Sequence, residues 1–230
     1  LKMNKFKKII NYPLKLYVKS EILKKKKLSD RFNHIYEKNY WGDLESVSGP
    51  GSSYKNSHMF TKSLKKLIKK YKIKHIIDAP CGDCNWIKKT FEIKNLKYLG
   101  IDIVPDLIKK NQMRFINYTN INFKILDITN TKLPKTDLII CRDFLFHLSF
   151  KDGKKFLKNL FNSKFKYLLT SSHSNGIKND FENLKDIKSG DFRKINIFKN
   201  PYNFDKKYEL CIKDFCDDAE KYMILFKSKN

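Results

Sequence analysis

The chain has 230 residues, of which 49 are lysine or arginine and 24 are aspartate or glutamate, so its formal net charge is +25. This length is enough for one large α/β domain and argues against a second. An odd set of five cysteines does not suggest a disulfide scaffold. No apolar run approaches the roughly 20 residues of a membrane span. We therefore expect one cytoplasmic domain without a transmembrane segment.

The positive charge raises the question of a nucleic-acid partner, because lysine-rich surfaces bind phosphate. Lysines occur in nearly every segment, however, beside many Asn, Ile, Phe and Tyr residues, as an AT-rich genome would produce. Nucleic acid therefore stays open as a partner but is not favoured. In this lysine-rich sequence, we interpret Arg142 and Arg193 as positions that need the planar guanidinium of arginine, which can make bidentate contacts that lysine cannot.

Residues 1–28 form a basic lead in which apolar residues alternate with lysines around Pro13. Such a segment could lie peripherally on an anionic membrane surface or on a partner protein. We favour the simpler interpretation of a helical lead that covers one edge of the domain. Residues 29–230 are then the domain proper.

Residues 29–38 show apolar residues at helical spacing and predict a short helix capped by Ser29 or Asp30. The following stretch, residues 40–54, combines large aromatic side chains with four Ser residues and three Gly residues. Loops of this composition are often lids over a site. An amphipathic helix is expected around residues 60–71.

The apolar run formed by Ile73, Ile76 and Ile77 predicts a buried strand that ends at Asp78, and a loop follows through Pro80 and Gly82. Residues 85–91 predict a helix directly after that loop. A dinucleotide site would need the pattern GxGxxG, which this loop matches poorly, whereas one central glycine fits an adenosylmethionine loop. The CxxC at residues 81–84 has no second pair, so we interpret it as small-residue packing and expect no metal.

Three more apolar runs end in or beside an acid, at residues 96–102, 123–127 and 137–143. Helices are expected at residues 105–117, between the first two of these runs, and at residues 151–162, after the last. A carboxylate after a second parallel strand, here Asp102, can accept both hydroxyls of a ribose. Asp127 after the third run could accept from an adenine amino group. A fifth strand is expected at 165–171, and residues 208–215 and 222–227 are expected to close the sheet as an antiparallel pair.

With these features the chain resembles the class I, Rossmann-like S-adenosylmethionine-dependent methyltransferases, and in particular small bacterial and viral members. The resemblance lies in the patterns DAPCGDxxW at residues 78–86 and RDxLFHLS at residues 142–149. A WG pair at residues 41–42 and SxSGxGS at residues 46–52 also match. The resemblance implies a three-layer α/β fold, with a mostly parallel seven-stranded sheet whose last strand is antiparallel. The implied cofactor is S-adenosylmethionine, with S-adenosylhomocysteine as its product.

The resemblance also implies the site residues. Asp143 or His147, four apart after the fourth strand, would be the base, and His147 has the more suitable ordinary pKa. The residues expected at the cofactor are Trp41, Ser52, Asp78, Ala79, Pro80, Cys81, Gly82, Trp86, Asp102, Ile103, Asp127, Ile128 and Arg142. The residues expected at the substrate are His173, Arg193 and Asn196.

The acceptor is less constrained. DNA and amide N-methyltransferases would carry an Asn/Asp-Pro-Pro-aromatic loop after the fourth strand, and residues 141–144, Cys-Arg-Asp-Phe, do not match it. We therefore expect O-methylation of a hydroxylated small molecule, or of a sugar or glycan. An RNA methyltransferase and a non-catalytic module that docks through residues 1–28 are the alternatives.

Overall fold

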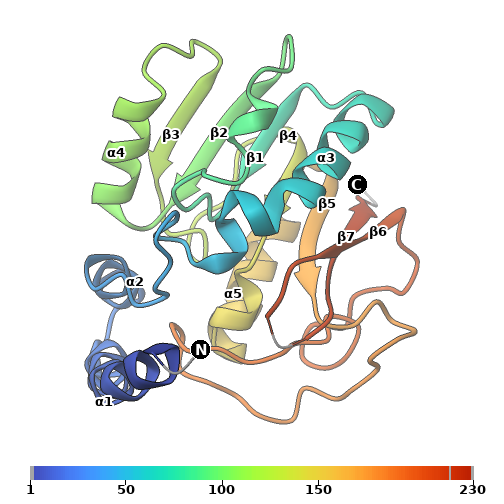
Figure 1. Ribbon diagram of the computed structural model, residues 1–230. Helices are drawn as coiled ribbons and strands as arrows, with labels where there is room; N and C mark the ends of the chain where they lie inside the picture. Colours follow the sequence, from blue (N-terminus) through green and yellow to red (C-terminus); the bar gives the residue numbers. More distant parts are fainter. Residues whose placement is uncertain (1–2, 218, 229–230) are drawn as a thin grey trace.

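A computed structural model describes the backbone of residues 3–217 and 219–228, and the side chains from residue 14 onward within these ranges. Its centre is one seven-stranded sheet with the strand order β3-β2-β1-β4-β5-β7-β6 (Figure 1). The strands are β1 His75–Asp78, β2 Lys97–Asp102, β3 Ile121–Ile125, β4 Thr136–Cys141, β5 Phe165–Ser172, β6 Leu210–Asp214 and β7 Lys221–Lys227. Among them β7 alone runs antiparallel to its neighbours. The predicted fold is confirmed.

Helices cover both faces of this sheet. In Figure 1, α3 crosses the front of the sheet and α5 lies behind it. The α-helices are α1 Met3–Lys24, α2 Leu28–Glu37, α3 Tyr54–Lys70, α4 Pro105–Arg114 and α5 Phe150–Phe161, and the 3-10 turns are η1 Pro50–Ser52, η2 Lys88–Thr90 and η3 Leu145–His147. One hydrophobic cluster lies beneath α3, and the other lies beneath α5, α2 and the end of α1. The molecule therefore has the expected three layers.

The sheet forms because its central strands are apolar on both faces. All six residues of β4 are buried, and β4 pairs in parallel with β1 and with β5. A strand buried on both sides needs such a continuous apolar run. Since the first five strands are parallel, the carboxyl ends of the central strands all meet at one edge of the sheet, where ligands bind in folds of this type.

Two local predictions are wrong. Residues 85–91 do not form a helix beyond the single turn η2, because residues 84–87 are four consecutive buried positions and a surface helix cannot bury four in a row. The α2 helix begins one residue before Ser29, and its N-cap, Lys27, makes no side-chain capping bond. Ser29 donates to Asp30 instead of capping the helix.

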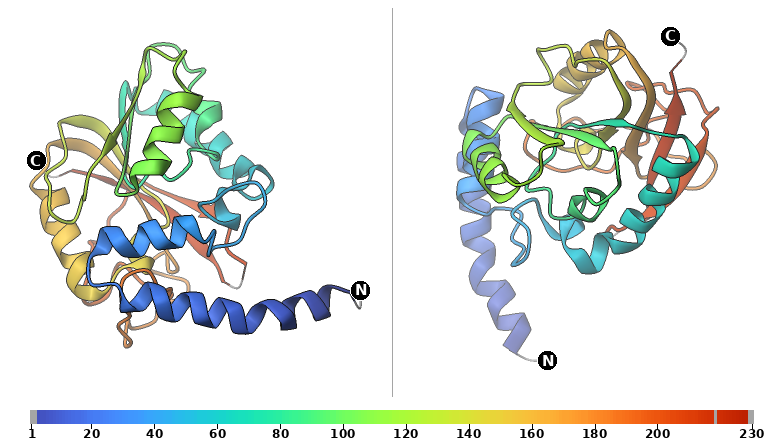
Figure 2. Two further views of the ribbon diagram at one scale, coloured as in Figure 1. Left: turned by 90° about the vertical axis from the view of Figure 1, so that its left-hand side faces the viewer. Right: turned by 90° about the horizontal axis from the view of Figure 1, so that it is seen from above.

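The lead segment is a long helix whose N-terminal end extends past the body of the molecule (Figure 2). Its C-terminal part is integrated into the domain, because Ile22 is fully buried in the cluster that also holds α2 and α5. A β-carbon at Gly190 would approach Ile22 and Ile35 to 3.3 Å, so the chain at Gly190 lies directly under these two helices. No helix within the described ranges is long and apolar enough to cross a membrane.

Candidate functional site

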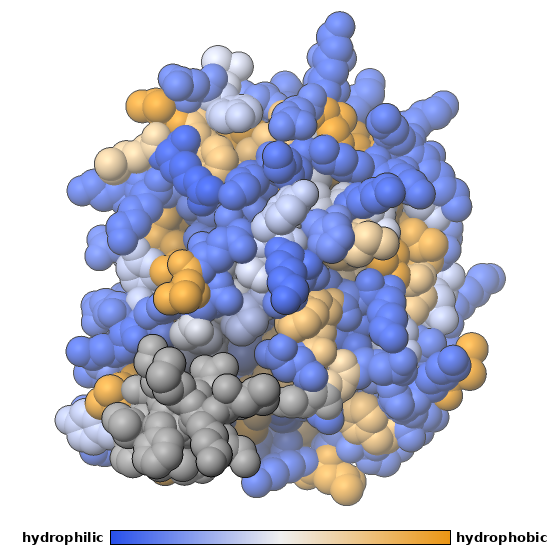
Figure 3. All heavy atoms as spheres, in the orientation of Figure 1, coloured by the Kyte–Doolittle hydropathy of each residue, from blue (hydrophilic) through white to orange (hydrophobic). Residues whose placement is uncertain are grey.

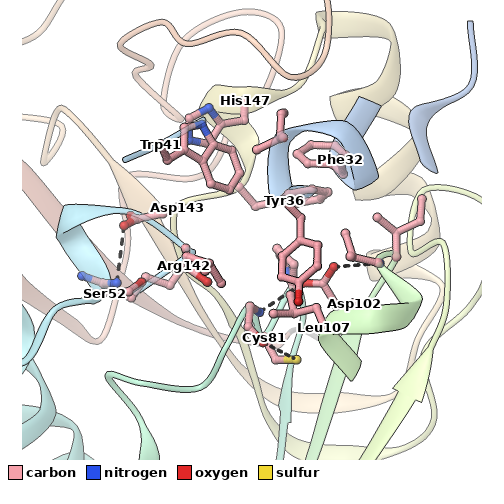
Figure 4. Close-up of a pocket in the computed structure, with 18 of the residues that line it drawn as sticks. Phe32, Tyr36, Trp41, Ser52, Cys81, Asp102, Leu107, Arg142, Asp143 and His147 are labelled. Carbon is pink, nitrogen blue, oxygen red and sulfur yellow. Dashed lines mark hydrogen bonds and ion pairs between the residues drawn. The ribbon is translucent and has the colours of Figure 1, made fainter. Parts of the chain in front are cut away.

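A deep pocket with about 750 Å³ of empty space opens at the carboxyl edge of the sheet (Figure 4). The walls of this main pocket are Phe32, Ile35, Tyr36, Trp41, Val47, Ser48, Ser52, Pro80, Cys81, Gly82, Trp86, Asp102, Ile103, Val104, Leu107, Arg142, Asp143, Phe144 and His147. It therefore gathers eleven of the predicted catalytic and cofactor residues from four segments of the chain, residues 41–52, 80–86, 102–103 and 142–147.

The loop after β1 is held open by its neighbours. Gly82 has a φ of +53°, and a β-carbon there would collide with the hydroxyl of Ser48, so both the backbone conformation and the space favour glycine. The same hydroxyl accepts from the backbone N–H of Asp83 at 3.0 Å. The serine-rich loop predicted as a lid thus rests directly on the loop after β1.

Asp102, at the end of β2, faces the main pocket. Its carboxylate accepts from the N–H of Gly82 and from the N–H of Val104, both at 3.1 Å. Burial raises its pKa to about 6 despite these hydrogen bonds. The carboxylate is therefore ionised at neutral pH and keeps lone pairs that can accept from a ligand.

A smaller hollow adjoins the main pocket and shares Phe32, Pro80, Asp102, Ile103 and Phe144 with it. Asp127 and Ile128 line this hollow but not the main pocket. The Asp127 carboxylate accepts from the N–H and hydroxyl of Thr129 and from the amide of Asn130. These three bonds fix its orientation at the far end of the combined cavity.

Two predicted cofactor residues do not line either cavity. Ala79 and Asp78 are fully buried beneath the loop after β1. Asp78 accepts from the hydroxyl of Tyr98 at 2.8 Å through one oxygen, and its other oxygen is buried without a partner in the described part of the chain. Burial raises its pKa to about 8, so the acid is mostly protonated at pH 7.

The protonated state of Asp78 predicts a specific pH dependence of stability. Its folded pKa lies above the unfolded value of about 4, so the folded state holds more protons and this group's stabilisation is lost as pH rises from about 4 to 8. Asp78→Asn should remove that dependence and be on the order of 1–3 kcal/mol more stable than the wild type at pH 8. Urea unfolding of both proteins at pH 5 and pH 8 measures this dependence. An equal change in the free energy of unfolding between the two pH values in wild type and Asp78→Asn would contradict the prediction.

Arg142 and Asp143 belong to a buried cluster of four charges. The Arg142 guanidinium donates twice to Asp214, at 2.9 and 3.1 Å, and to the carbonyl of Gly51 at 2.9 Å. Lys221 donates to both oxygens of Asp143, at 2.7 and 2.8 Å, and lies 3.2 Å from Asp214. Arg142 thus forms a wall of the pocket with most of its donors already in use.

The same cluster decides the protonation of Asp143. Burial alone would raise the pKa of this carboxyl, but the charges of Arg142 and Lys221 outweigh burial and hold the pKa well below its usual range. The residue also has a φ of +57° and binds Ser171 through its carboxylate. Asp143 is therefore a permanently ionised, fully paired carboxylate, which makes it a weak base.

His147 has the opposite character. Its Nδ1 lies 2.8 Å from the carbonyl oxygen of Asp191, and because a carbonyl can only accept, Nδ1 carries the proton. Burial lowers the pKa of His147 below its ordinary value, so the ring is neutral near pH 7. Among the described residues, no hydrogen bond engages Nε2, and this atom is not buried. The ring presents a basic lone pair.

The surroundings of His147 hold that orientation. The indole of Trp41 lies 4.9 Å from the imidazole, centroid to centroid, and the two rings lie together in Figure 4. Gly190 donates to the His147 carbonyl at 2.7 Å. Lys19 of α1 forms an ion pair of 2.7 Å with the side chain of Asp191, whose carbonyl holds the ring. The lead helix thus supports the loop that orients His147.

A second, more open cleft meets the main pocket at Trp41, Ser48, Asp143 and His147, which line both. Its remaining walls are Lys15, Tyr40, Gly49, Pro50, Gly51, Phe146, Gly190, Asp191, Phe192, Lys194, Phe215, Cys216, Asp217 and Lys221. This outer cleft is rich in aromatic rings and reaches the surface beside α1. His147 therefore stands where a ligand in the main pocket and a ligand in the outer cleft would meet.

The three predicted substrate residues line neither cavity. Arg193 donates to Tyr202 and Asp186, and Asn196 donates to Asp180 and Phe181, so both hold the chain around residues 180–204 together. His173 is buried beside Phe146, and its Nδ1 accepts from the N–H of Ile195. The structure places His173 against Phe146 and Phe192 of the outer cleft wall. Arg193 and Asn196 bind residues that line neither cavity.

Sequence reasoning missed the contribution of α2 to the pocket. Phe32, Ile35 and Tyr36 of this helix form part of the wall. Their helical spacing was recognised, but an apolar face at that spacing looks the same whether it covers a core or a ligand site. Leu107 of α4 was missed for the same reason.

Comparisons with known proteins agree with this geometry. A family model described as a methyltransferase domain matches residues 77–163, which span β1 to the end of α5. The chain has the fold of a Rossmann-like methyltransferase. A search of curated proteins found no match.

Three solved structures illustrate the likeness. The methyltransferase domain of bacterial CtHen1 aligns with 73% of this chain and 96% of its own, at 16% identity and a TM-score of 0.55. Magnesium protoporphyrin IX methyltransferase from Synechocystis PCC 6803, crystallised with SAM, aligns with 88% of this chain and 97% of its own, at 13% identity and a TM-score of 0.59. The N-methyltransferase NodS from Bradyrhizobium japonicum WM9, crystallised with SAH, aligns with 85% of this chain and 99% of its own. Its sequence identity is 11% and its TM-score is 0.57. At these identities the likeness shows the fold alone.

Proposed function

We propose that the protein is an S-adenosylmethionine-dependent methyltransferase that methylates a hydroxyl group. The observation that carries the proposal is the neutral, oriented His147 at the junction of the two cavities. The matched methyltransferase model and the SAM- and SAH-bound proteins of the same fold support the choice of cofactor.

The residues of the main pocket fit such a cofactor. In this proposal Asp102 accepts from the ribose hydroxyls, because it is an ionised acceptor at the end of β2. Asp127 and Ile128 would contact the adenine in the side hollow, and the backbone of the Gly82 loop would hold the methionyl part. S-adenosylmethionine, when bound, supplies an already activated methyl group on a sulfonium. The face of Trp41 can stabilise that positive charge by about 0.5–2 kcal/mol.

A hydroxyl acceptor is favoured because the site holds a base. A hydroxyl must lose its proton during methyl transfer, and Nε2 of His147 can take it at neutral pH. The tightly paired Asp143 cannot compete for that role. The rings of Tyr40, Phe192 and Phe215 in the outer cleft offer flat surfaces to a sugar or another cyclic acceptor. We therefore keep a hydroxylated small molecule or glycan as the leading acceptor class.

The direct test is incubation of the protein with methyl-labelled S-adenosylmethionine and a panel of sugars, phenols, lipids and RNA oligonucleotides. Transfer of label to a hydroxylated compound, lost in acid when His147 is protonated, would support the proposal. Transfer to an amine or to a nucleobase would contradict the O-methylation part. Binding of the cofactor without transfer to any member of the panel would favour the non-catalytic alternative.

Asp102→Ala should weaken binding of S-adenosylhomocysteine by about tenfold to a hundredfold, because two hydrogen bonds to a charged acceptor are lost. For the wild type, affinity should fall below pH 6, where the carboxylate of pKa about 6 becomes protonated. Isothermal titration calorimetry at pH 5 and pH 7.5 measures both effects. Asp106→Asn, an exposed acid on α4, is the matched control. Unchanged affinity for S-adenosylhomocysteine in Asp102→Ala would contradict the assignment of Asp102 to the ribose hydroxyls.

A further inference from the structure

The solvent face of α3 carries a straight row of lysines. Lys55, Lys62, Lys66 and Lys69 are seven, four and three residues apart, so on a helix of 3.6 residues per turn they lie within about 40° of one line. All four are exposed, and the row runs for about 21 Å along the helix. The buried residues of α3 lie on its opposite side. Figure 3 shows that hydrophilic side chains cover much of the face that α3 crosses.

These lysines have no acidic neighbours in the sequence. No aspartate or glutamate occurs between Glu45 and Asp78, although the chain has 24 acids in 230 residues. An AT-rich genome explains many lysines but does not explain the absence of acids from residues 46–77. In the fold, one acid reaches the start of α3, where the Glu45 carboxylate accepts from the N–H of Tyr54 at 2.9 and 3.0 Å. Other lysines of the described surface do pair with acids, as Lys166 does with Asp137 and Lys65 of α3 does with Glu92. None of the described ion pairs involves the four lysines of the row.

The row begins at the site. Directly before α3, Gly51 and Ser52 line the outer cleft and the main pocket respectively. At this end of the helix the exposed ring of Tyr54 lies 5.9 Å from that of His58. Aromatic rings beside a row of cations are the features on which single-stranded nucleic acids bind, because bases stack on the rings and phosphates follow the cations.

We propose that this face of α3 binds the phosphate backbone of a single-stranded nucleic acid and leads it toward the cleft. An anionic membrane fits less well, because α3 buries its apolar side in the core and has no apolar side to insert. This binding proposal does not depend on the proposed methyl transfer, so it can be tested separately from it.

The test is fluorescence anisotropy of the full chain with a labelled 20-nucleotide single-stranded RNA and the DNA of the same sequence. If the four lysines contact four phosphates, affinity should fall about 50-fold between 50 and 200 mM salt. A variant with Lys55, Lys62, Lys66 and Lys69 replaced by Gln should lose that part of the salt dependence and bind at least about tenfold more weakly at 50 mM. A circular dichroism melt checks that this variant is folded, and the Lys62→Gln/Lys66→Gln pair replaces it if not.

The control replaces four lysines on the other side of the sheet by Gln. The α5 helix carries Lys151, Lys154, Lys155 and Lys158, which are exposed and also share one helix face. The proposal requires that this control bind like the wild type. Equal losses in the two variants would show an effect of net charge alone and overturn the proposal. Binding to vesicles of phosphatidylcholine and phosphatidylserine without binding to either oligonucleotide would also overturn it.

Discussion

His147→Gln should lower the turnover rate by about 10²- to 10⁴-fold with any hydroxylated acceptor that the wild type methylates. The neutral imidazole presents Nε2 at the junction of the two cavities, and the glutamine amide cannot take a proton at neutral pH. Cofactor affinity should stay within a few fold, because His147 belongs to the end of the main pocket shared with the outer cleft.

The pH profile separates a base from a structural histidine. In the wild type the rate should fall as pH drops through the pKa of His147, which burial places below its ordinary value, because the protonated ring cannot accept a proton. His147→Gln should lack that acidic limb. His75→Gln, at the start of β1 on the opposite edge of the sheet, is the matched control. Wild-type turnover in His147→Gln would refute the assignment, and loss of turnover in Asp143→Asn with unchanged stability would transfer the role to Asp143.

Arg142→Met should destabilise the folded protein by about 3–5 kcal/mol, because it leaves the buried carboxylate of Asp214 and the partly exposed carboxylate of Asp143 with one cation, Lys221, between them. The Arg142 side chain is 2% exposed, and that of Asp214 is fully buried. The methionine can keep the contacts that the guanidinium makes with the rings of Phe60 and Trp86, so the loss should come mainly from charge. Urea unfolding at pH 7 measures the difference in unfolding free energy.

Two further variants identify the cause. Arg142→Lys keeps the charge but loses the fork that contacts Asp214 and Gly51 together, so it should recover only part of the stability. Arg142→Met/Asp214→Leu removes one charge of each sign and should be more stable than Arg142→Met alone. Arg114→Met, an exposed arginine on α4, is the control and should change stability by less than about 1 kcal/mol. If Arg142→Met lowers the free energy of unfolding by less than about 1 kcal/mol, the charge cluster does not stabilise the folded state on balance.

The fold could be predicted because its signals are local. A run such as residues 138–141 is apolar over a length that suits a strand. Segments with apolar residues at the 3.6-residue spacing of a helix separate such runs, which is typical of a parallel sheet. The helix predicted at residues 85–91 failed because spacing cannot reveal that four consecutive side chains would be buried by α3 and its neighbours.

The site was partly predictable for the same reason. Residues at the ends of parallel strands, such as Asp102, must lie at one edge of the sheet whatever the details of packing. His173 was assigned from its position at the end of the fifth strand, whereas Arg193 and Asn196 were assigned to the substrate by resemblance in a region of irregular structure. There, the structure shows Arg193 and Asn196 paired with nearby loop residues.

By itself, the sequence determined the order of the strands and helices and the polar residues that end the strands, because both follow from short-range patterns. Only the tertiary structure decided the properties of those residues. Lys221, 78 positions from Asp143, makes that acid a permanent anion, and the carbonyl of Asp191, 44 positions from His147, makes that histidine a base. A pKa depends on the charges, hydrogen bonds and burial around a group, and folding brings these from distant parts of the chain.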